Sequence, residues 1–314
     1  MKVAVVGAGG VGGYFGARLQ ASGVEVGFLA RGAHLEAIRT DGLRITSPLG
    51  DVHLQNVMAS DRPEDLGAFD VVLVAVKTWQ LDAVLDAVAA LTAEEGVVVP
   101  LLNGVEAADR IATRVGEDRV LGGTCKILSQ VASPGHVAHL GSTPWVSFGE
   151  RGSVPAAPSA RADALHRLFR SAEVAARVAD DIEAVVWDKL LFVASLGAVG
   201  AASRAPVGVV RTVPRTRALL RAAMGEVEQV AESCGVRLSS DAVDRAMRFV
   251  DGLPEAATSS LQRDIIEGRQ SELEAWSGAV VRLAEASDIA VPVHAHLYAS
   301  LLPQALKAQR LVNF

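Results

Sequence analysis

The stretch KVAVVGAGGVGG, residues Lys2–Gly13, decides the fold of this chain. Its first part, Lys2–Val6, is an apolar run that predicts a buried β-strand. A helical stretch, Val11–Ala21, and a second strand, Glu25–Ala30, follow within the first thirty residues. A strand, a glycine loop, a helix and a strand in this order predict a Rossmann-type, doubly wound α/β sheet.

The glycines of this stretch have the spacing G-x-G-x-x-G, formed by Gly7, Gly9 and Gly12. In this motif the first glycine makes a tight turn, the second lets a pyrophosphate approach the backbone, and the third allows close packing of helix and strand. The N–H groups and the dipole of the following helix would hold the anion. A mere tight turn is the alternative, and the strand and helix around the motif favour a dinucleotide site.

The end of the second strand indicates which dinucleotide would bind. An acidic residue there would accept a hydrogen bond from the ribose 2′-hydroxyl of NADH. This sequence has Arg31 instead, and a guanidinium can clamp a 2′-phosphate. We therefore predict NADPH as the cofactor; the alternative is that Arg31 is an ordinary solvated arginine.

Two further apolar strands, Asp70–Val76 and Val97–Leu102, have the composition of buried parallel strands. Lys77 follows the first strand and Asn103 the second, at the carboxyl ends where ligands bind in such sheets. Each has a simpler interpretation. Lys77 could be a solvated loop lysine, and Asn103 could belong to an Asn-Gly turn.

The rest of the first half predicts more β-structure. Gly42–Ala59 has the pattern of a hairpin that turns at Ser47–Asp51 and is inserted in the wound sheet. Gly135–Leu140 and Trp145–Gly149 are expected to form an antiparallel pair. A helix up to about Ala172 and a strand over 174–178 would complete the first domain.

The second half is predicted to be all-helical, because strand alternation ends near residue 180 and helical periodicity replaces it. We therefore divide the chain into an NADP-binding domain, 1–179, and a helical substrate or catalytic domain, 180–314. The predicted helices are Asp181–Ala202, Pro214–Cys234, Ser239–Val250, Ser259–Ile266, Glu272–Ser287 and His294–Lys307.

Two charged residues of this half are candidates for chemistry. Lys189 precedes a run without further charge until Arg204. It could be a catalytic ammonium group, or a lysine whose stem lies on the core while its head reaches water. Glu272 lies beside an apolar stripe, where a first-turn glutamate would also suit the helix dipole.

The bulk composition excludes several classes of protein. Half of the 314 residues are hydrophobic, and the net charge of -6 argues against non-specific binding of nucleic acid. The two cysteines form no disulfide framework and no metal cluster, which favours the cytoplasm. The apolar run over 190–203 is shorter than the roughly 18 residues that span a membrane. The oligomeric state stays open, a homodimer included.

Together these residues resemble the ketopantoate reductase (2-dehydropantoate 2-reductase) family over nearly the whole chain. No single motif carries the resemblance; their order and spacing do. The motifs are GAGGVGG at 7–13, ARG at 30–32, KTWQ at 77–80, LLNG at 101–104, WDKL at 187–190, APVG at 205–208, and TSSLQRD at 258–264 with Glu272 downstream.

The resemblance implies NADPH-dependent reduction of a 2-oxo acid, with 2-dehydropantoate as the first candidate, and thus a role in pantothenate biosynthesis. The residues that it assigns to the cofactor are Gly7, Ala8, Gly9, Gly10, Val11, Gly12, Arg31, Lys77 and, by a looser alignment, Ser129.

It also implies roles for four residues at the reacting atoms. Asn103 would lie between nicotinamide and substrate, and Lys189 would be the proton donor. Ser260 would bind the substrate carboxylate, and Glu272 would hold the cofactor and the lysine in place. The chemistry agrees with this, because an ammonium group stabilises and then protonates the oxyanion formed by hydride addition. Apolar surroundings lower the pKa of a lysine and make it a better donor.

The sequence departs from the family pattern beside the lysine. The family has asparagine four and eight residues after it, where this chain has Val193 and Gly197. Val207 replaces a third asparagine that contacts the substrate. Each lost partner would leave a substrate polar group unpaired, at about 1–3 kcal/mol when buried. A dehydrogenase for a less polar D-2-hydroxy acid is therefore the second hypothesis.

A hypothesis of another class is a non-catalytic dinucleotide sensor. Such a protein would need only the first domain, so the retained Lys189, Ser260 and Glu272 argue against it.

Overall fold

The computed structural model describes residues 1–141, 143–152, 154 and 159–313, and it separates into two compact units. The first unit consists of Met1–Leu102 and Ala107–Ile182. The second consists of Asn103–Glu106 and the chain from Glu183 onward. The expected division after residue 179 did not anticipate that the short segment 103–106 belongs with the helical unit.

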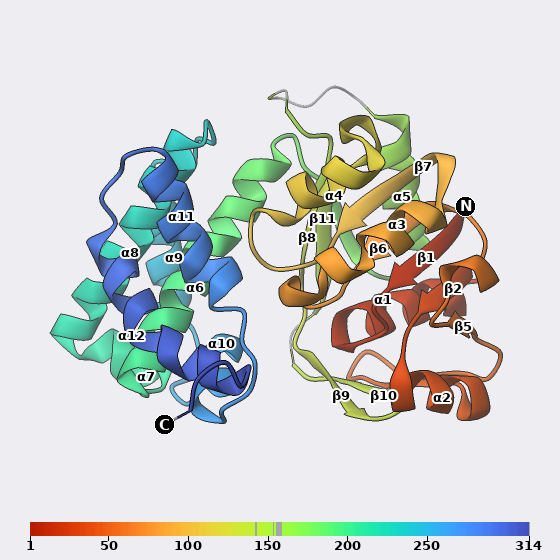
Figure 1. Ribbon diagram of the computed structural model, residues 1–314, viewed down its shortest axis with the longest axis horizontal. Helices are drawn as coiled ribbons and strands as arrows, with labels where there is room; N and C mark the ends of the chain where they lie inside the picture. The colour runs from red at the N-terminus through yellow and green to blue at the C-terminus, as the bar shows by residue number, and fades with distance from the viewer. Residues whose placement is uncertain (142, 153, 155–158, 314) are drawn as a thin grey trace. The chain divides into compact units, whose positions relative to one another are not determined.

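The first unit contains a five-stranded parallel sheet with the order β5-β2-β1-β6-β7 (Figure 1). This is the doubly wound arrangement predicted from the glycine loop, and the strand order reverses between β1 and β6. The strands are β1 (Lys2–Val6), β2 (Glu25–Leu29), β5 (Met58–Ser60), β6 (Phe69–Val74) and β7 (Thr92–Pro100). The helices of this unit are α1 (Gly10–Ala21), α2 (Gly32–Asp41), α3 (Leu85–Leu91), α4 (Ala107–Val115) and α5 (Ala160–Ser171).

Two smaller sheets complete the first unit, with the orders β4-β3-β10-β9 and β12-β11-β8. Their strands are β3 (Leu43–Thr46), β4 (Val52–Leu54), β8 (Gly122–Lys126), β9 (Ser129–Ser133), β10 (His136–His139), β11 (Trp145–Gly149) and β12 (Ala175–Val178).

Two strand predictions in this region are wrong in part. The hairpin is present as β3 and β4, but it joins β10 rather than the wound sheet, and Met58–Ser60 is the edge strand of that sheet. β10 and β11 do not pair with each other: β10 pairs with β9 and β3, whereas β11 pairs with β8 and β12. Alternating hydrophobicity identifies a strand but not its partner, and the mostly exposed β9 carries almost no apolar signal.

The second unit is all-helical within the described residues, as predicted. Its helices are α6 (Ile182–Ser203), α7 (Val207–Thr212), α8 (Pro214–Ser233), α9 (Ala242–Asp251), α10 (Ser260–Ile266), α11 (Ala279–Ala286) and α12 (Pro292–Ala308). The predicted helix over 272–287 is interrupted, because Glu274–Gly278 forms a π-helical turn before α11. Such turns insert one residue into a helix and occur often at functional sites.

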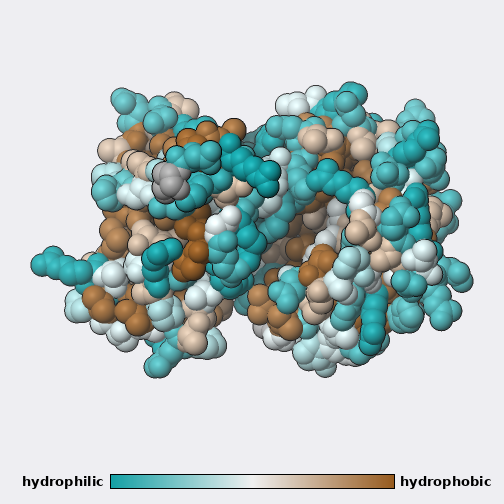
Figure 2. Space-filling model, turned by 60° about the horizontal axis from the view of Figure 1, so that its bottom comes forward, coloured by the Kyte–Doolittle hydropathy of each residue, from teal (hydrophilic) through white to brown (hydrophobic). Residues whose placement is uncertain are grey.

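α6 contributes a large share of the second unit's core. It is long and apolar enough to cross a membrane by composition, and it is the one such helix in the described part of the chain. However, 61% of its most apolar stretch is buried in the structure, as expected for a core helix. On the face drawn in Figure 2, hydrophilic residues are spread over the surface and hydrophobic residues lie in groups among them.

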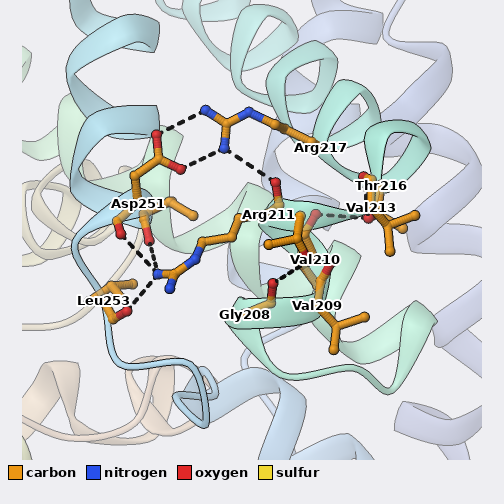
Figure 3. A network of polar contacts seen from close by, with 11 residues as sticks. Gly208, Val209, Val210, Arg211, Val213, Thr216, Arg217, Asp251 and Leu253 are labelled. Atoms are coloured by element: carbon orange, nitrogen blue, oxygen red, sulfur yellow. Dashed lines mark hydrogen bonds and ion pairs between the residues drawn. The ribbon is translucent and has the colours of Figure 1, made fainter.

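An arginine network fixes the short helix α7 against α9 (Figure 3). Nη1 of Arg211 donates to the carbonyl oxygens of Val250, Asp251 and Leu253 at 3.2, 2.9 and 2.6 Å. These carbonyls lie at or just beyond the end of α9, where helical partners are missing. Arg217 forms a two-pronged ion pair with Asp251, at 2.6 and 2.9 Å. The network therefore holds the segment after the APVG motif in place.

Candidate functional site

The glycine loop between β1 and α1 requires glycine at two positions for the fold itself. Gly7 has a φ of 97°, which disfavours other residues, and a Cβ there would lie 3.0 Å from the backbone nitrogen of Val76. A Cβ at Gly12 would lie 2.1 Å from the carbonyl oxygen of Gly7 and 2.8 Å from a methyl group of Val5. These two glycines allow α1 to pack directly on the sheet.

Gly9 is different. Its φ is -70°, which any residue adopts, and a Cβ there would meet no atom of the described chain within 4 Å. Neither backbone conformation nor packing requires glycine at this position. The remaining reason is access of a ligand to the backbone at the start of α1, where Gly9 itself provides no side-chain cap.

Ser129 of β9 lies over this same loop. Its carbonyl oxygen and its Oγ would be 2.9 and 3.0 Å from a Cβ at Gly10. The hydroxyl is buried and has no hydrogen-bond partner among the described residues. A polar group of this kind, next to helix N–H groups, suits contact with a phosphate oxygen.

Arg31 and Lys77 lie at the carboxyl edge of the parallel sheet, directly after the second strand and close to the end of β6. Both side chains are exposed. The ammonium group of Lys77 lies 5.7 Å from the centre of the Trp79 ring, a cation–π arrangement. The first unit thus presents its two predicted cationic residues at the same edge as the glycine loop.

In the second unit the structure brings two predicted residues together that are 169 positions apart. Nδ2 of Asn103 donates to Oε2 of Glu272 at 3.1 Å. Glu272 is buried, with 5% of its surface exposed. Gly104, with a φ of 96°, lies against the backbone of Ala275. The Asn-Gly turn therefore exists, and it also presents the amide of Asn103 to a buried carboxylate.

A second interaction fixes the segment 103–106 to the helix that follows Glu272. Arg282 pairs with Glu106 at 2.9 Å and also with Glu274. Tyr298 donates to Glu274 at 2.6 Å, and burial together with this carboxylate raises the pKa of Tyr298 to about 12. The phenol therefore stays neutral and acts as a hydrogen-bond donor at ordinary pH.

Lys189, Val193 and Gly197 lie on one face of α6, because they are spaced by four residues. Lys189 and Val193 are half-buried, and Gly197 is buried. A Cβ at Gly197 would lie 3.0 Å from a methyl carbon of Leu261 and 3.1 Å from the ring of Trp276. The face that carries Lys189 is therefore closed by apolar side chains two turns further along.

This contact links three elements that carry predicted site residues. Leu261 is adjacent to Ser260 at the start of α10, and Trp276 lies one turn after Glu272. Ser260 itself is half-buried. The packing of Gly197 against these neighbours therefore joins α6, the start of α10 and the segment after Glu272 within the second unit.

Comparisons with known proteins assign the chain to a family. The model of "Ketopantoate reductase PanE/ApbA" matches residues 3–153, and the model of its C-terminal part matches residues 181–304. A 2-dehydropantoate 2-reductase of Mesorhizobium japonicum is 32% identical, over 93% of this chain and 94% of the relative. The chain belongs to the ketopantoate reductase family.

Solved structures agree with the ketopantoate reductase fold. The 2-dehydropantoate 2-reductase of Geobacter metallireducens superposes with a TM-score of 0.88 and 32% identity, over 96% of this chain and 99% of that one. A D-mandelate dehydrogenase, described with NADH and anilino(oxo)acetate, has a TM-score of 0.87 at 20% identity, over 98% and 100% of the two chains. This second likeness concerns the fold alone.

At the three positions where the resemblance to the ketopantoate reductase family led us to expect asparagine, the structure shows apolar packing. Gly197 leaves no room for a longer side chain while Leu261 and Trp276 hold their places. Val193 packs against the core of the unit. Val207 is 2% exposed, and its N–H donates to the carbonyl oxygen of Ala257 at 3.0 Å. These positions now form apolar contacts.

Some residues near the two sites had no signal in the sequence. His34, which contacts the glycine loop, is one of several histidines in the chain. Trp276 and Arg282 look like an ordinary core residue and an ordinary surface charge. Their roles depend on contacts between distant segments. Within the described residues, no group of three or more His, Cys, Asp or Glu is placed to hold a metal ion.

Proposed function

We propose that this oxidoreductase reduces a 2-oxo acid to the 2-hydroxy acid with NADPH, and that 2-dehydropantoate is the first candidate substrate. The observation that carries the proposal is the hydrogen bond between Asn103 and the buried Glu272, in the unit that also contains Lys189 and Ser260. A chain that had lost catalysis would have no need of this arrangement. The cytoplasm and pantothenate biosynthesis are the corresponding location and pathway.

The cofactor is assigned to the first unit. When bound, NADPH supplies the hydride. Gly9 leaves the start of α1 accessible, and the unpartnered Oγ of Ser129 lies beside it, so these residues fit a pyrophosphate. Arg31 would bind the 2′-phosphate through charge-assisted hydrogen bonds, which favours NADPH over NADH.

The proton is assigned to Lys189. Hydride addition leaves negative charge on the C2 oxygen of the substrate, and the ammonium group would stabilise this charge and then protonate it. Asn103 and Glu272 would orient the reacting groups, and the hydroxyl of Ser260 would bind the substrate carboxylate.

A second candidate substrate is a less polar 2-oxo acid. The packing of Gly197 against Leu261 and Trp276 favours it, because no amide can stand there to pair with a substrate hydroxyl. An unpaired hydroxyl in a buried site costs about 1–3 kcal/mol. The chemistry of Lys189 is the same for either substrate.

The test is the rate of NADPH oxidation with 2-dehydropantoate and with a panel of apolar 2-oxo acids, repeated with NADH. We expect turnover with NADPH to exceed turnover with NADH. A clear preference for 2-dehydropantoate would support a pantothenate enzyme, and a preference for an apolar acid would support the second candidate. Tight NADPH binding without turnover of any 2-oxo acid would contradict the proposal and favour a sensor.

A further inference from the structure

The hairpin formed by β9 and β10 covers the start of α1. Besides Ser129 over Gly10, Val137 of β10 would lie 3.0 Å from a Cβ at Gly13. The rings of Tyr14 and His139 are 5.0 Å apart. The hairpin therefore packs against the glycine loop and the start of α1, and its position determines the position of the Ser129 hydroxyl.

His34 of α2 joins this hairpin to the glycine loop. Its Nε2 lies 2.8 Å from the carbonyl oxygen of Ala8, within the loop. Its Nδ1 accepts a hydrogen bond from the backbone N–H of Gly135, in the turn of the hairpin, at 3.0 Å. One half-buried imidazole thus contacts two backbone segments that are more than a hundred residues apart.

The two contacts also fix the tautomer of the ring. Because Nδ1 accepts from an N–H group, it carries no hydrogen. The ring hydrogen is then on Nε2, which donates it to the carbonyl oxygen of Ala8. Both nitrogens of the ring therefore have a backbone partner.

We infer that His34 is a positioning residue for the dinucleotide, a role that rests on the proposed function. By holding Ala8 and Gly135 at fixed separation, it keeps the hydroxyl of Ser129 beside the first N–H groups of α1. The hairpin keeps its ladder with β3 and the bond from the N–H of Arg44 to the carbonyl oxygen of Gly135. Loss of the imidazole therefore lets the hairpin shift relative to the glycine loop, while β10 stays paired with β3.

Substitutions of His34 separate the two contacts. In His34→Gln the amide nitrogen reaches the position of Nε2 and can donate to the carbonyl oxygen of Ala8, so this variant restores only that contact. His34→Asn supplies only an acceptor at the position of Nδ1, and His34→Leu supplies neither. We expect the Kd of NADPH to rise about 5- to 20-fold in His34→Leu, since about 1–2 kcal/mol of positioning is lost. His34→Asn and His34→Gln each restore one contact, so both should be intermediate between wild type and His34→Leu.

The matched control is His166→Leu. Nε2 of His166 also contacts a backbone carbonyl, that of Ala176 at 3.1 Å, but this partner belongs to β12 and not to the glycine loop. It should leave the Kd of NADPH unchanged. For His34→Leu, we expect the KM of NADPH to rise while kcat at saturating NADPH changes less than about twofold, because the catalytic groups lie elsewhere.

Each outcome decides one question. Equal NADPH affinity in wild type and His34→Leu, or equal losses in His34→Leu and His166→Leu, would overturn the inference alone. If His34→Leu does not fold, wild-type affinity for NADPH in both His34→Asn and His34→Gln would overturn it. A wild-type protein that binds neither NADPH nor NADH would overturn the proposed function, and this inference with it.

Discussion

The glycine loop of the first unit and the Lys189 face of α6 in the second unit are built differently. In the loop, the geometry depends on the backbone: on the φ of Gly7, on the space beside Gly9 and on the contact at Gly12. On α6, it depends on which side chains from α10 and the π-helical turn fill the space beside Gly197. Backbone requirements constrain residue type at fixed spacing, whereas packing can change by paired substitutions.

This difference explains why the glycine loop matches the expected family motif and the positions after Lys189 do not. The glycine motif is complete, because each glycine answers a separate geometric demand. The asparagines after Lys189 are absent, and apolar neighbours occupy their space. On the proposed function, the dinucleotide site would therefore keep the family pattern, and the space beside Gly197 would suit a less polar substrate.

The largest expected effect concerns Lys189. Lys189→Met should lower kcat about 10²- to 10⁴-fold, because the developing oxyanion loses its proton donor. The Kd of NADPH should change little. Stopped-flow rates and fluorescence titration with NADPH would measure both. Lys307→Met, which removes an exposed lysine of α12, is the control, and a Lys189→Met rate near that of this control would contradict the role.

The next effect separates the two kinds of glycine. Gly9→Ala should weaken NADPH binding at least about 100-fold while the melting temperature stays constant, since its Cβ meets only space needed by the ligand. Gly12→Ala should lower the stability of the apo protein by about 1–3 kcal/mol, since its Cβ overlaps the carbonyl oxygen of Gly7. Calorimetry of both variants would test this, and equal melting temperatures would refute the distinction.

Arg31→Ala should weaken NADPH binding about 10- to 100-fold and leave NADH binding nearly unchanged. Only NADPH carries the 2′-phosphate, and a charge-assisted hydrogen bond contributes about 1.5–3 kcal/mol. Isothermal titration with both cofactors gives an internal control. Equal losses of affinity for NADPH and NADH would mean that Arg31 is an ordinary solvated arginine.

The smallest expected effect concerns the contact of Gly197 with Trp276. Gly197→Asn should destabilise the protein, and adding Trp276→Leu should recover part of that loss, because the indole no longer fills the space. The indole nitrogen has no hydrogen-bond partner in the described residues, so its removal breaks no such bond.

In the double variant, kcat/KM for 2-dehydropantoate relative to an apolar 2-oxo acid should rise about tenfold over Trp276→Leu alone, the value of one hydrogen bond. Gly225→Asn in α8 is the control, because a Cβ there meets no described atom within 4 Å. An unchanged ratio in a folded double variant would mean that this position does not affect substrate choice.

Most of the architecture can be predicted from the sequence, because it depends on local patterns. The parallel sheet and most helices follow from local periodicity, and the glycine loop follows from its spacing. The partners of β10 and β11 were wrong, because pairing joins segments that are distant in sequence. The π-helical turn at 274–278 was missed, since the apolar Leu273, Trp276 and Val280 have spacings of three and four that also fit an uninterrupted α-helix.

The sites follow the same pattern. The positions of Arg31 and Lys77 at the edge of the parallel sheet could be predicted, because strand ends are visible in the sequence. The bond between Asn103 and Glu272 could not be derived from either local stretch, since one reads as a turn and the other as a helix start. His34 could not be predicted at all, because both of its partners are backbone atoms.

The most direct measurement follows the hydride itself. NADPH carrying deuterium at both C4 positions would be incubated with the protein and with 2-dehydropantoate or an apolar 2-oxo acid, and the product examined by NMR. We expect deuterium at C2 of the 2-hydroxy acid, formed at a rate that falls with Lys189→Met. Bound NADPH with no deuterium in any 2-hydroxy acid would contradict the assignment of this chain as a 2-oxo acid reductase.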